Sequence, residues 1–234
     1  RTVELPGGLA VPVRILRIAE TRDAAQNAVR EARVTASVDG VEIELRCANY
    51  ELPRPAGRVQ VDCPVTAAYM ANSTIDHWGL RADARLRLWP AGANWMTPGE
   101  IGYPLKQRWF LTHTQMANEP TYADRGEQQS RKKVYYHAGL DLGGAEALAQ
   151  VVAATDGLIV SLGKEVLPEH ESGTPVAPRY DVLYLRDKRG WYYRYSHLYS
   201  FDPSLKLGAE IKQGAKLGLL GKEGGGGGWT HLHF

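Results

Sequence analysis

Two short groups of residues in this chain combine side chains that bind metal ions. The first is His137-Ala138-Gly139-Leu140-Asp141, in which an imidazole and a carboxylate stand four positions apart. Glycines at 139, 143 and 144 argue against a helix, and on a strand this even spacing places both side chains on one face. The second is His231-Leu232-His233-Phe234, where a strand would likewise place both imidazoles on one face. We therefore expect each group to present two polar side chains in one direction.

Together the two groups supply nitrogen and oxygen ligands of the kind that zinc prefers. Three such ligands, at about 2.0–2.2 Å from the ion, leave the fourth tetrahedral position for water, as in a catalytic zinc site. A structural zinc site of four cysteines is excluded because Cys47 and Cys63 are the only 2 cysteines. Both lie in or beside strand-like segments, and the sequence leaves open whether they form a disulfide or an unpaired buried pair.

A third segment, Trp191 to Leu198, alternates in a way that would place Tyr193, Tyr195 and His197 on one strand face. His197 is therefore a further candidate for the chemistry. A single histidine is more often a hydrogen-bonded structural residue than a metal ligand. The remaining histidines have no partner at a recognisable spacing and are interpreted as structural or surface residues: His77, His113 and His170.

The elements that would position these groups are mainly β-strands. In the N-terminal half, alternating runs predict strands over Val11–Ile18, Val34–Val38, Val41–Leu45, Arg58–Val65 and Ala84–Trp89. Asp39-Gly40, between two of these runs, is typical of a hairpin turn with positive φ. One helix is predicted over Thr21–Ala32, where alanines recur on overlapping turns and Thr21 or Asp23 could cap the first turn.

A polar segment over Asn118–Lys133 suggests a boundary between two domains, a β-rich domain over 1–124 and a second domain over 125–234. Beyond Val134, short strands punctuated by glycines favour antiparallel sheets over a βαβ arrangement. The run Gly224–Gly228 predicts a mobile loop just before the histidine pair. It could form a flexible wall of a groove or a solvated hairpin tip.

Composition limits the classes of function. With 44% hydrophobic and 23% charged residues, the chain is typical of a globular protein. A net charge of +2, from 28 basic and 26 acidic side chains, gives no field for a nucleic acid, so no nucleic-acid partner is expected. No apolar run reaches the roughly 18–20 residues of a membrane span. The chain begins at Arg1 without a leader, and we expect an export signal to have been removed.

Taken together, the motifs resemble the zinc metallopeptidases of family M23, of the lysostaphin or LytM type. The resemblance covers about Val134 to Phe234. It rests on H-x-G-x-D-x-G, then Tyr-x-His-Leu, then Gly-x-x-Leu-Gly-x-x-Gly and finally the terminal H-L-H-F, with two further matches at Val152–Val160 and Leu207–Gly214. It implies a C-terminal antiparallel β-sheet peptidase core behind a β-rich N-terminal domain of unknown role.

The resemblance also implies roles for individual residues. His137, Asp141 and His233 would bind Zn²⁺, whereas His197 and His231 would stay unligated, one taking a proton from the water and the other stabilising charge on the carbonyl oxygen. An imidazole, with an ordinary pKa near 6.5, can do this at neutral pH. The chain has no H-E-x-x-H motif, so a histidine is the expected base.

The implied function is an exported, periplasmic or extracellular, zinc endopeptidase acting on the cross-linking peptides of bacterial peptidoglycan. One alternative is a catalytically silent or autoinhibited wall-binding or activator module of the same family. The presence of all five residues favours the enzyme. A more distant alternative is a metal-dependent carbohydrate-binding or structural β protein, in which the histidines serve no catalysis.

The sequence departs from the family pattern before the last motif. There the family usually has a loop rich in Ser or Thr that ends in Gly-Pro, whereas this chain has Gly221–Thr230, which leaves the substrate preference open. The segment Gly163–Tyr180 is either a loop bordering the groove or an inert connection. Some members of the family have an inhibitory asparagine as a fourth ligand, and Asn118 is a candidate without a supporting motif. Trp78 and Trp95 are either sugar-stacking or core residues.

Overall fold

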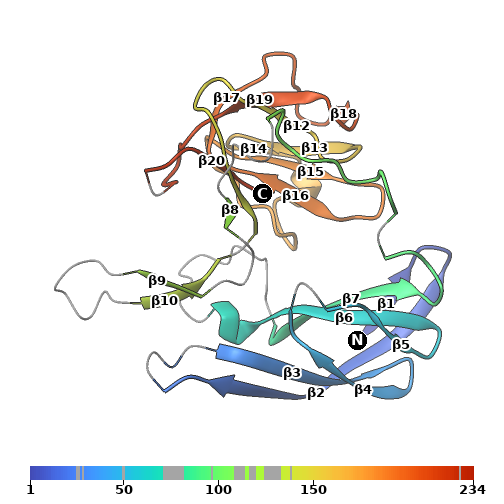
Figure 1. The fold of residues 1–234 in the computed structure, drawn as a ribbon. Coiled ribbons are helices and arrows are strands. Elements are labelled where there is room, and N and C mark those ends of the chain that lie inside the picture. Colours follow the sequence, from blue (N-terminus) through green and yellow to red (C-terminus); the bar gives the residue numbers. More distant parts are fainter. Residues whose placement is uncertain are drawn as a thin grey trace. The chain divides into compact units, whose positions relative to one another are not determined.

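In the computed structural model the described residues are 1–24, 27, 29–48, 51–70, 82–95, 97–107, 114–115, 120–123, 133–137, 139–226 and 228–234. The chain is mainly β, as predicted, with antiparallel strand pairs (Figure 1). It divides into two compact units, one of Arg1–Trp95 with Ala117–His137 and one of Met96–Met116 with Ala138–Phe234. The predicted boundary between 124 and 125 lies outside the described residues at Asp124, so it stays a prediction. No described helix is long and apolar enough to cross a bilayer.

The first unit contains a four-stranded sheet in the order β1-β2-β3-β4, a three-stranded sheet in the order β5-β6-β7, and the β9–β10 pair. Its elements are β1 Thr2–Leu5, β2 Leu9–Arg22, β3 Val29–Val38, β4 Val41–Arg46, β5 Arg54–Ala56, β6 Val59–Thr66, the 3₁₀ helix η1 Ala67–Met70, β7 Ala84–Pro90, β9 Pro120–Ala123 and β10 Lys133–Tyr136.

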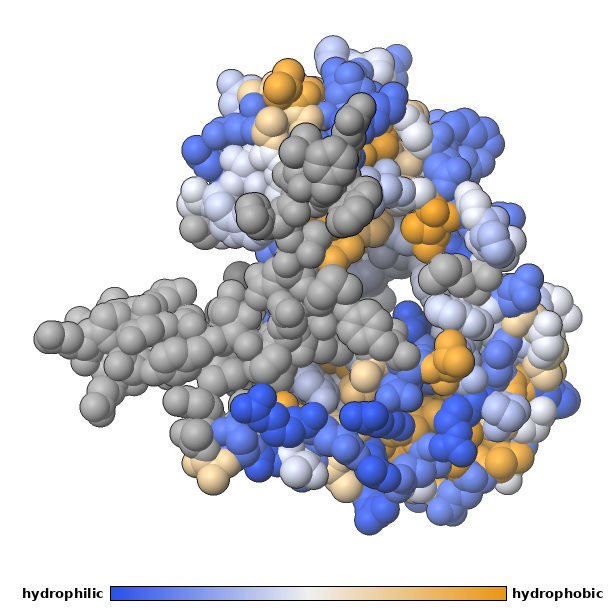
Figure 2. Space-filling view, viewed as in Figure 1, coloured by the Kyte–Doolittle hydropathy of each residue, from blue (hydrophilic) through white to orange (hydrophobic). Residues whose placement is uncertain are grey.

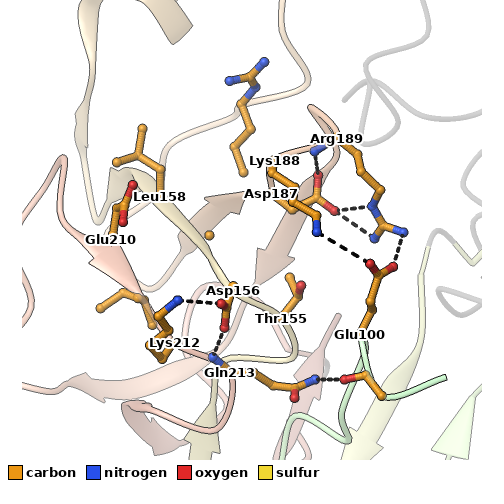
Figure 3. Close-up of a pocket in the computed structure, with 14 residues that line it drawn as sticks. Glu100, Thr155, Asp156, Leu158, Asp187, Lys188, Arg189, Glu210, Lys212 and Gln213 are labelled. Carbon is orange, nitrogen blue, oxygen red and sulfur yellow. Dashed lines mark hydrogen bonds and ion pairs between the residues drawn. The ribbon is translucent and has the colours of Figure 1, made fainter. Parts of the chain in front are cut away.

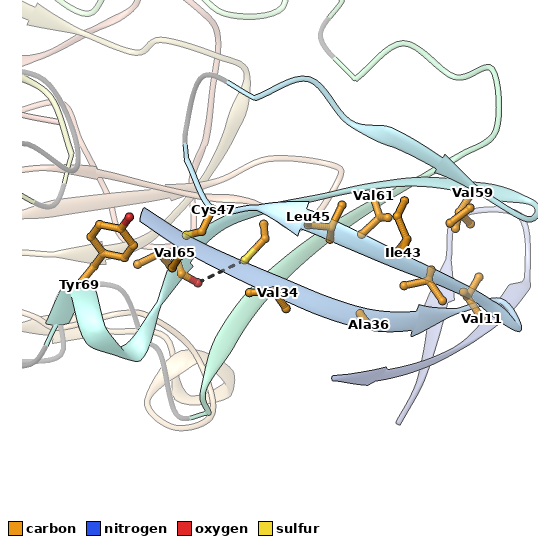
Figure 4. Close-up of a cluster of buried hydrophobic side chains, with 14 of the residues drawn as sticks. Val11, Val34, Ala36, Ile43, Leu45, Cys47, Val59, Val61, Val65 and Tyr69 are labelled. Atoms are coloured by element: carbon orange, nitrogen blue, oxygen red, sulfur yellow. Dashed lines mark hydrogen bonds between the residues drawn. The ribbon is translucent and has the colours of Figure 1, made fainter. Parts of the chain in front are cut away.

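The strands predicted in this half are confirmed. β3 alternates from Ala32 on with one face buried, whereas β6 is buried along nearly its whole length. The predicted turn also forms, with positive φ at Asp39 (50°) and Gly40 (79°) between the paired residues Val38 and Val41. The buried side chains of β3, β4 and β6 make one apolar core, drawn in Figure 4.

The helix predicted over Thr21–Ala32 is wrong. β2 continues to Arg22, β3 begins at Val29, and these two residues face each other across a hairpin. Ala32 is fully buried opposite Glu20 in this ladder. Alanine has a high helix propensity but packs equally well on the inner face of a sheet, so strand pairing overrides the local preference.

Cys47 and Cys63 are both buried in the core of the first unit and are not bridged. They face each other as a backbone bridge between the end of β4 and β6. The pKa of the Cys47 thiol is raised, first by its hydrogen bond to Cys63 and then by burial. The Cys63 sulfur lies 3.7 Å from the carbonyl oxygen of Val65. The structure therefore has the unpaired buried pair, one of the two arrangements that the sequence left open.

Large exposed hydrophobic residues of the first unit include Leu16, Val41 and Leu52. On the face drawn in Figure 2, hydrophobic and hydrophilic residues are intermixed over the described surface. Scattered apolar side chains of this kind are normal on a monomer and need no functional explanation.

The second unit contains three small sheets, in the orders β20-β11-β8, β12-β19-β17 and β14-β13-β15-β16, the last with β18 paired to β13. Its elements are β8 Thr114–Gln115, β11 Asp141–Gly143, β12 Gln150–Val152, β13 Gly157–Leu162, β14 Glu165–Val166, η4 Pro168–His170, β15 Leu183–Arg186, β16 Tyr192–Tyr195, β17 Leu198–Phe201, β18 Glu210–Ile211, β19 Lys216–Leu220 and β20 His231–His233.

The core of the second unit determines which face of β11 and β20 is available for chemistry. Leu142 and Leu232 oppose each other in the β11–β20 ladder and are 1% and 0% exposed. Because side chains alternate along a strand, burying these leucines turns the neighbours of each to the opposite face. A slip of one residue would place the polar residues in the core, so the apolar residues fix the register.

Candidate metal centre

The β11–β20 ladder brings the two sequence groups together. Asp141 lies opposite His233, and the carboxylate Oδ1 is 2.8 Å from Nδ1 of that imidazole. Gly143 lies opposite His231 and brings no side chain to this face. The other carboxylate oxygen, Oδ2, is 3.4 Å from Nε2 of His231. The predicted strand at the histidine pair is thus confirmed, and one carboxylate contacts both imidazoles.

His137 completes a group of three. One ligand atom each from His137, Asp141 and His233 lies within 4.8 Å of the others, and within the described ranges this is the one cluster of three His, Cys, Asp or Glu side chains so arranged. His137 and Asp141 are buried and His233 is half-buried. Imidazole nitrogens and a carboxylate oxygen are ligands that zinc takes in proteins, so the donor types of this compact group fit a zinc ion.

Glycine at 139 allows the backbone to pass this close to the group. Its φ is +109°, and a Cβ there would lie 2.6 Å from the carbonyl oxygen of Phe234 and 3.2 Å from Nε2 of His233. The amide of the next residue, Leu140, donates to the same carbonyl oxygen of Phe234 at 2.7 Å. The glycine of H-x-G-x-D is therefore required by packing against the second histidine.

His231 is 3% exposed and held from two sides. Its Nδ1 is 3.0 Å from the carbonyl oxygen of Trp229, and the indole of Trp229 stacks on the imidazole with ring centres 4.2 Å apart. A carbonyl oxygen only accepts, so Nδ1 carries a proton, and Nε2 is the nitrogen that faces Asp141.

His197 lies beside His231, with ring centres 4.6 Å apart. Its Nδ1 contacts the carbonyl oxygen of Glu223, which again leaves the lone pair on Nε2. β16 ends at Tyr195, and His197 follows with a φ of +68°, so the predicted alternation over Tyr193, Tyr195 and His197 does not continue through the histidine. His197 reaches the site from a corner between β16 and β17.

Sequence reasoning missed Asp181, a fully buried carboxylate that accepts the backbone N–H of His197 at 2.9 Å. No local motif marks it, because it stands 16 positions before its partner. The signal is the register of the β15–β16 hairpin: Leu183 pairs with Tyr195, and two steps further the ladder would reach Asp181 and His197. Predicting this pair requires the exact turn as well as the strands.

The other candidates lie elsewhere. Asn118, His77, His113 and Trp78 are outside the described residues. His170 is buried, and its Nδ1 is 2.8 Å from the hydroxyl of Tyr192, which makes it a structural residue. Trp95 is 38% exposed. The segment Gly163–Tyr180 includes β14 and η4, and at its end the Tyr180 hydroxyl accepts the N–H of Gly224 at 2.8 Å.

A second polar cluster of this unit contains no histidine. Figure 3 shows a pocket in which Asp187 pairs with Arg189, Asp156 pairs with Lys212, and Glu100 reaches Arg189. Asp187 also accepts the backbone N–H groups of Arg189 and Trp191, both at 2.9 Å. Each of these carboxylates has a fixed cation as partner, so the cluster has no evident site for proton transfer.

The C-terminal part of the chain is similar to a known protein family. The family model described as peptidase family M23 matches residues 135–234. The range contains His137, Asp141, His197, His231 and His233, so each residue that forms the site falls within the match. No protein among the curated sequences matches the chain.

Three solved structures are similar to this chain. The catalytic domain of the antimicrobial peptidase lysostaphin from Staphylococcus simulans is 22% identical, over 52% of this chain and 77% of that one, with a TM-score of 0.37. The solution structure of lysostaphin is 20% identical, over 58% of this chain and 46% of that one, with a TM-score of 0.38. A zinc-containing peptidase from Vibrio cholerae is 14% identical, over 92% of this chain and 80% of that one, with a TM-score of 0.38.

The ordered motifs and the family match agree on the same residues. The H-x-G-x-D group and the terminal histidine pair, which suggested the family, are the segments that the structure joins in one ladder. In residues 135–234 this chain is similar to peptidase family M23.

Proposed function

We propose that this protein is an exported zinc endopeptidase that cleaves peptide bonds in the cross-links of bacterial peptidoglycan. The observation that carries the proposal is the grouping of His137, Asp141 and His233 within 4.8 Å, beside two further imidazoles that are not part of that group. Three ligands with an open fourth position are typical of catalytic zinc, whereas structural sites have four.

The donor set supports zinc as the metal. Two imidazoles and one carboxylate match the borderline character of Zn²⁺, and the described part of the group contains no thiolate. When bound, zinc supplies a Lewis acid that lowers the pKa of a water molecule towards about 7 and polarises a carbonyl. Asp141 would supply the one carboxylate ligand, and its Oδ1 lies 2.8 Å from Nδ1 of His233.

In this proposal His231 and His197 move protons and stabilise charge. In each, Nδ1 faces a backbone carbonyl oxygen, so Nε2 is the nitrogen left for the chemistry. One of them would accept the proton of the attacking water on Nε2 and return it to the leaving amine. The other would carry a proton on Nε2 as well and donate a hydrogen bond to the scissile carbonyl oxygen. Both rings are buried, which strengthens their interaction with developing charge.

The choice of peptidoglycan rests on the match of residues 135–234 to peptidase family M23 and on the motifs that resemble that family. The competing proposal is a catalytically silent or autoinhibited module that binds the cell wall. Loss of one or more of the five residues would favour it, and here the full set is present. Export agrees with such a substrate, since cross-linked peptidoglycan lies outside the cytoplasmic membrane.

The test is release of new amino groups from purified peptidoglycan by the full chain, followed by mass spectrometry of the fragments. We expect release that a zinc chelator stops and that added Zn²⁺ restores. The mass of each fragment then identifies the bond that is cut. No release by a folded, zinc-loaded protein would contradict the endopeptidase and support the silent module.

A further inference from the structure

A buried carboxylate contacts the backbone and approaches the ring of His197. Asp181 Oδ2 accepts the backbone N–H of this histidine at 2.9 Å and lies 3.5 Å from its ring Nδ1. The side chain of Asp181 is fully buried. The carbonyl oxygen of Asp181 also accepts the N–H of Leu198, at 3.2 Å. The backbone N–H groups of His197 and Leu198 thus both donate to Asp181.

A guanidinium keeps this carboxylate charged. Both side-chain nitrogens of Arg179 that face Asp181 donate to it, the second at 2.6 Å. Burial alone would raise the pKa of Asp181, but the hydrogen bonds from His197 and Arg179 outweigh it and hold the pKa below its ordinary range. The carboxylate is therefore a permanent acceptor beside Nδ1.

His197 needs such an anchor because its backbone is in the left-handed region, at a φ of +68°. For a residue other than glycine this conformation is unfavourable, and it persists only where the surrounding structure enforces it. The bond from its N–H to Asp181 fixes the backbone, and the contact from Nδ1 to the Glu223 carbonyl fixes the ring. Two oxygens, those of the Glu223 carbonyl and of the Asp181 carboxylate, face Nδ1 and favour a proton there and a lone pair on Nε2. Arg179 Nη2 also lies 3.3 Å from Nδ1, but it donates to Asp181 Oδ2 at the shorter distance of 2.6 Å.

Glycine at position 224 lets the loop backbone pack against Asp181 and Arg179. A Cβ at Gly224 would lie 2.4 Å from Asp181 Oδ1 and 2.5 Å from Nε of Arg179, and φ there is +61°. The N–H of Gly224 is bonded to the Tyr180 hydroxyl. The loop therefore packs its backbone directly on the ion pair, which a side chain at 224 would prevent.

We propose, on the basis of the proposed function, that Asp181 is a positioning residue that holds His197 in the Nδ1-protonated tautomer and aims its Nε2 at the reacting atoms. Arg179 orients the carboxylate, and the loop carbonyl of Glu223 completes the set of acceptors. Asp181 acts through His197, since it belongs to no metal group in the described chain and its contacts are with this histidine and with Arg179.

The chain offers a matched control in Asp187. It is a buried aspartate, paired with an arginine two positions away and bonded to backbone N–H groups, in the same unit (Figure 3). In the described part of the chain its side chain bonds to Arg189, Trp191 and Tyr193 rather than to a histidine. A generic effect of removing a buried carboxylate would appear in both variants.

The experiment compares Asp181→Asn and Asp187→Asn in the zinc-loaded full chain. We expect Asp181→Asn to lower kcat on a purified peptidoglycan fragment about 10–100-fold, with KM within twofold and zinc content unchanged. Nitrogen-15 NMR of the neutral imidazoles should show His197 moving from the Nδ1–H towards the Nε2–H tautomer. The Asp187→Asn variant should retain both kcat and the tautomer.

An unchanged His197 tautomer in Asp181→Asn, or an equal change in Asp187→Asn, would overturn the positioning role. The NMR readout needs no turnover, so it separates this failure from failure of the proposed endopeptidase activity. If Asp181→Asn does not fold, Arg179→Gln replaces it. That variant leaves the carboxylate in place but unoriented, so kcat should fall about tenfold, and an unchanged kcat would likewise count against the inference.

Discussion

The two units each contain a buried carboxylate, but the partners of these carboxylates differ in kind. In the first unit, Asp62 is 2% exposed and faces Arg87 across the β6–β7 ladder, with Arg87 Nε donating to it at 2.8 Å. In the second, Asp141 is equally buried, but its partners are His231 and His233. An arginine keeps its proton at any ordinary pH, whereas an imidazole can lose it and can bind a metal.

The surroundings of these carboxylates differ in the same way. Val61 and Cys63, the neighbours of Asp62 on β6, belong to the apolar core drawn in Figure 4. Asp141 instead contacts the imidazoles of His231 and His233, and the ring of His231 lies against that of His197. Burying polar groups costs stability unless they are paired. A metal ion held by His137, Asp141 and His233 would supply such pairing.

The largest effect on activity is expected from His233→Ala. This change removes one of the three ligand atoms of the candidate metal group, and Asp141 loses its 2.8 Å partner. We expect zinc content and peptidase activity to be lost together, activity by more than the roughly 100-fold that follows from loss of an outer partner. Metal analysis after dialysis and the amino-group assay measure both. Full zinc binding in this variant would mean that the imidazole paired with Asp141 is not a metal ligand, and Asp141 would then no longer differ from Asp62 in this respect.

The next effect is that of His231→Ala. Its ring contacts Asp141 but is not in the three-ligand group, so zinc should stay bound at the level of the unchanged protein. Turnover should fall about 10²–10⁴-fold, as expected for loss of a general acid or base. The same metal analysis and assay apply. A folded variant that loses its zinc would show that the roles of His231 and His233 are reversed.

A smaller effect on activity, but a large one on stability, is expected in the first unit. Leu45 is 2% exposed in β4, and Leu45→Ala should lower the free energy of unfolding of this unit by about 2–5 kcal/mol. Below the unfolding temperature, zinc content and kcat should be unchanged. Thermal unfolding with parallel activity assays checks this, and Leu16→Ala, at a 44% exposed position, serves as the control. A large loss of kcat in the folded Leu45→Ala protein would mean that the first unit takes part in catalysis.

Strand alternation explains which parts of this comparison were predictable. Period two in Val34–Val38 and in His231-Leu232-His233 correctly predicted inward and outward faces, because burial acts on each strand locally. The Asp39-Gly40 turn was predictable for the same reason, since its positive φ depends on two residues. The metal group followed from two such local patterns and the resemblance.

Long-range register was not predictable. The alanines between Thr21 and Ala32 fit a helix, and only the pairing of Arg22 with Val29 decides for a hairpin. Asp181 meets His197 because a complete hairpin between them has one particular register. The packing of Gly224 on Asp181 depends on a third segment. Such contacts depend on the whole sheet, so local periodicity carries no signal for them.

The smallest effect is expected at a half-buried carboxylate of the first unit, Asp39. Asp39 accepts three hydrogen bonds from Arg58, including one from its backbone N–H at 2.8 Å. These bonds, the side-chain ones first, lower the pKa of Asp39 from 3.8 to about 2. The folded state therefore binds this proton less readily than the unfolded state, so the pair stabilises the fold above pH 4 and the contribution is lost as the pH falls towards 2.

Asp39→Asn removes this dependence. The unfolding temperature of the variant should lie slightly below that of the unchanged protein at pH 5, and the gap should close as the pH approaches 2. Added salt should narrow the gap at pH 5, because Arg58 is 59% exposed and solvent ions screen the pair. Thermal unfolding from pH 2 to 5 at low and high salt measures both. A gap independent of pH would assign the effect to the turn at Asp39, with its φ of +50°, rather than to the charge. A gap that closes would show that in the first unit a carboxylate with an arginine partner adds only stability, as the comparison with Asp141 requires.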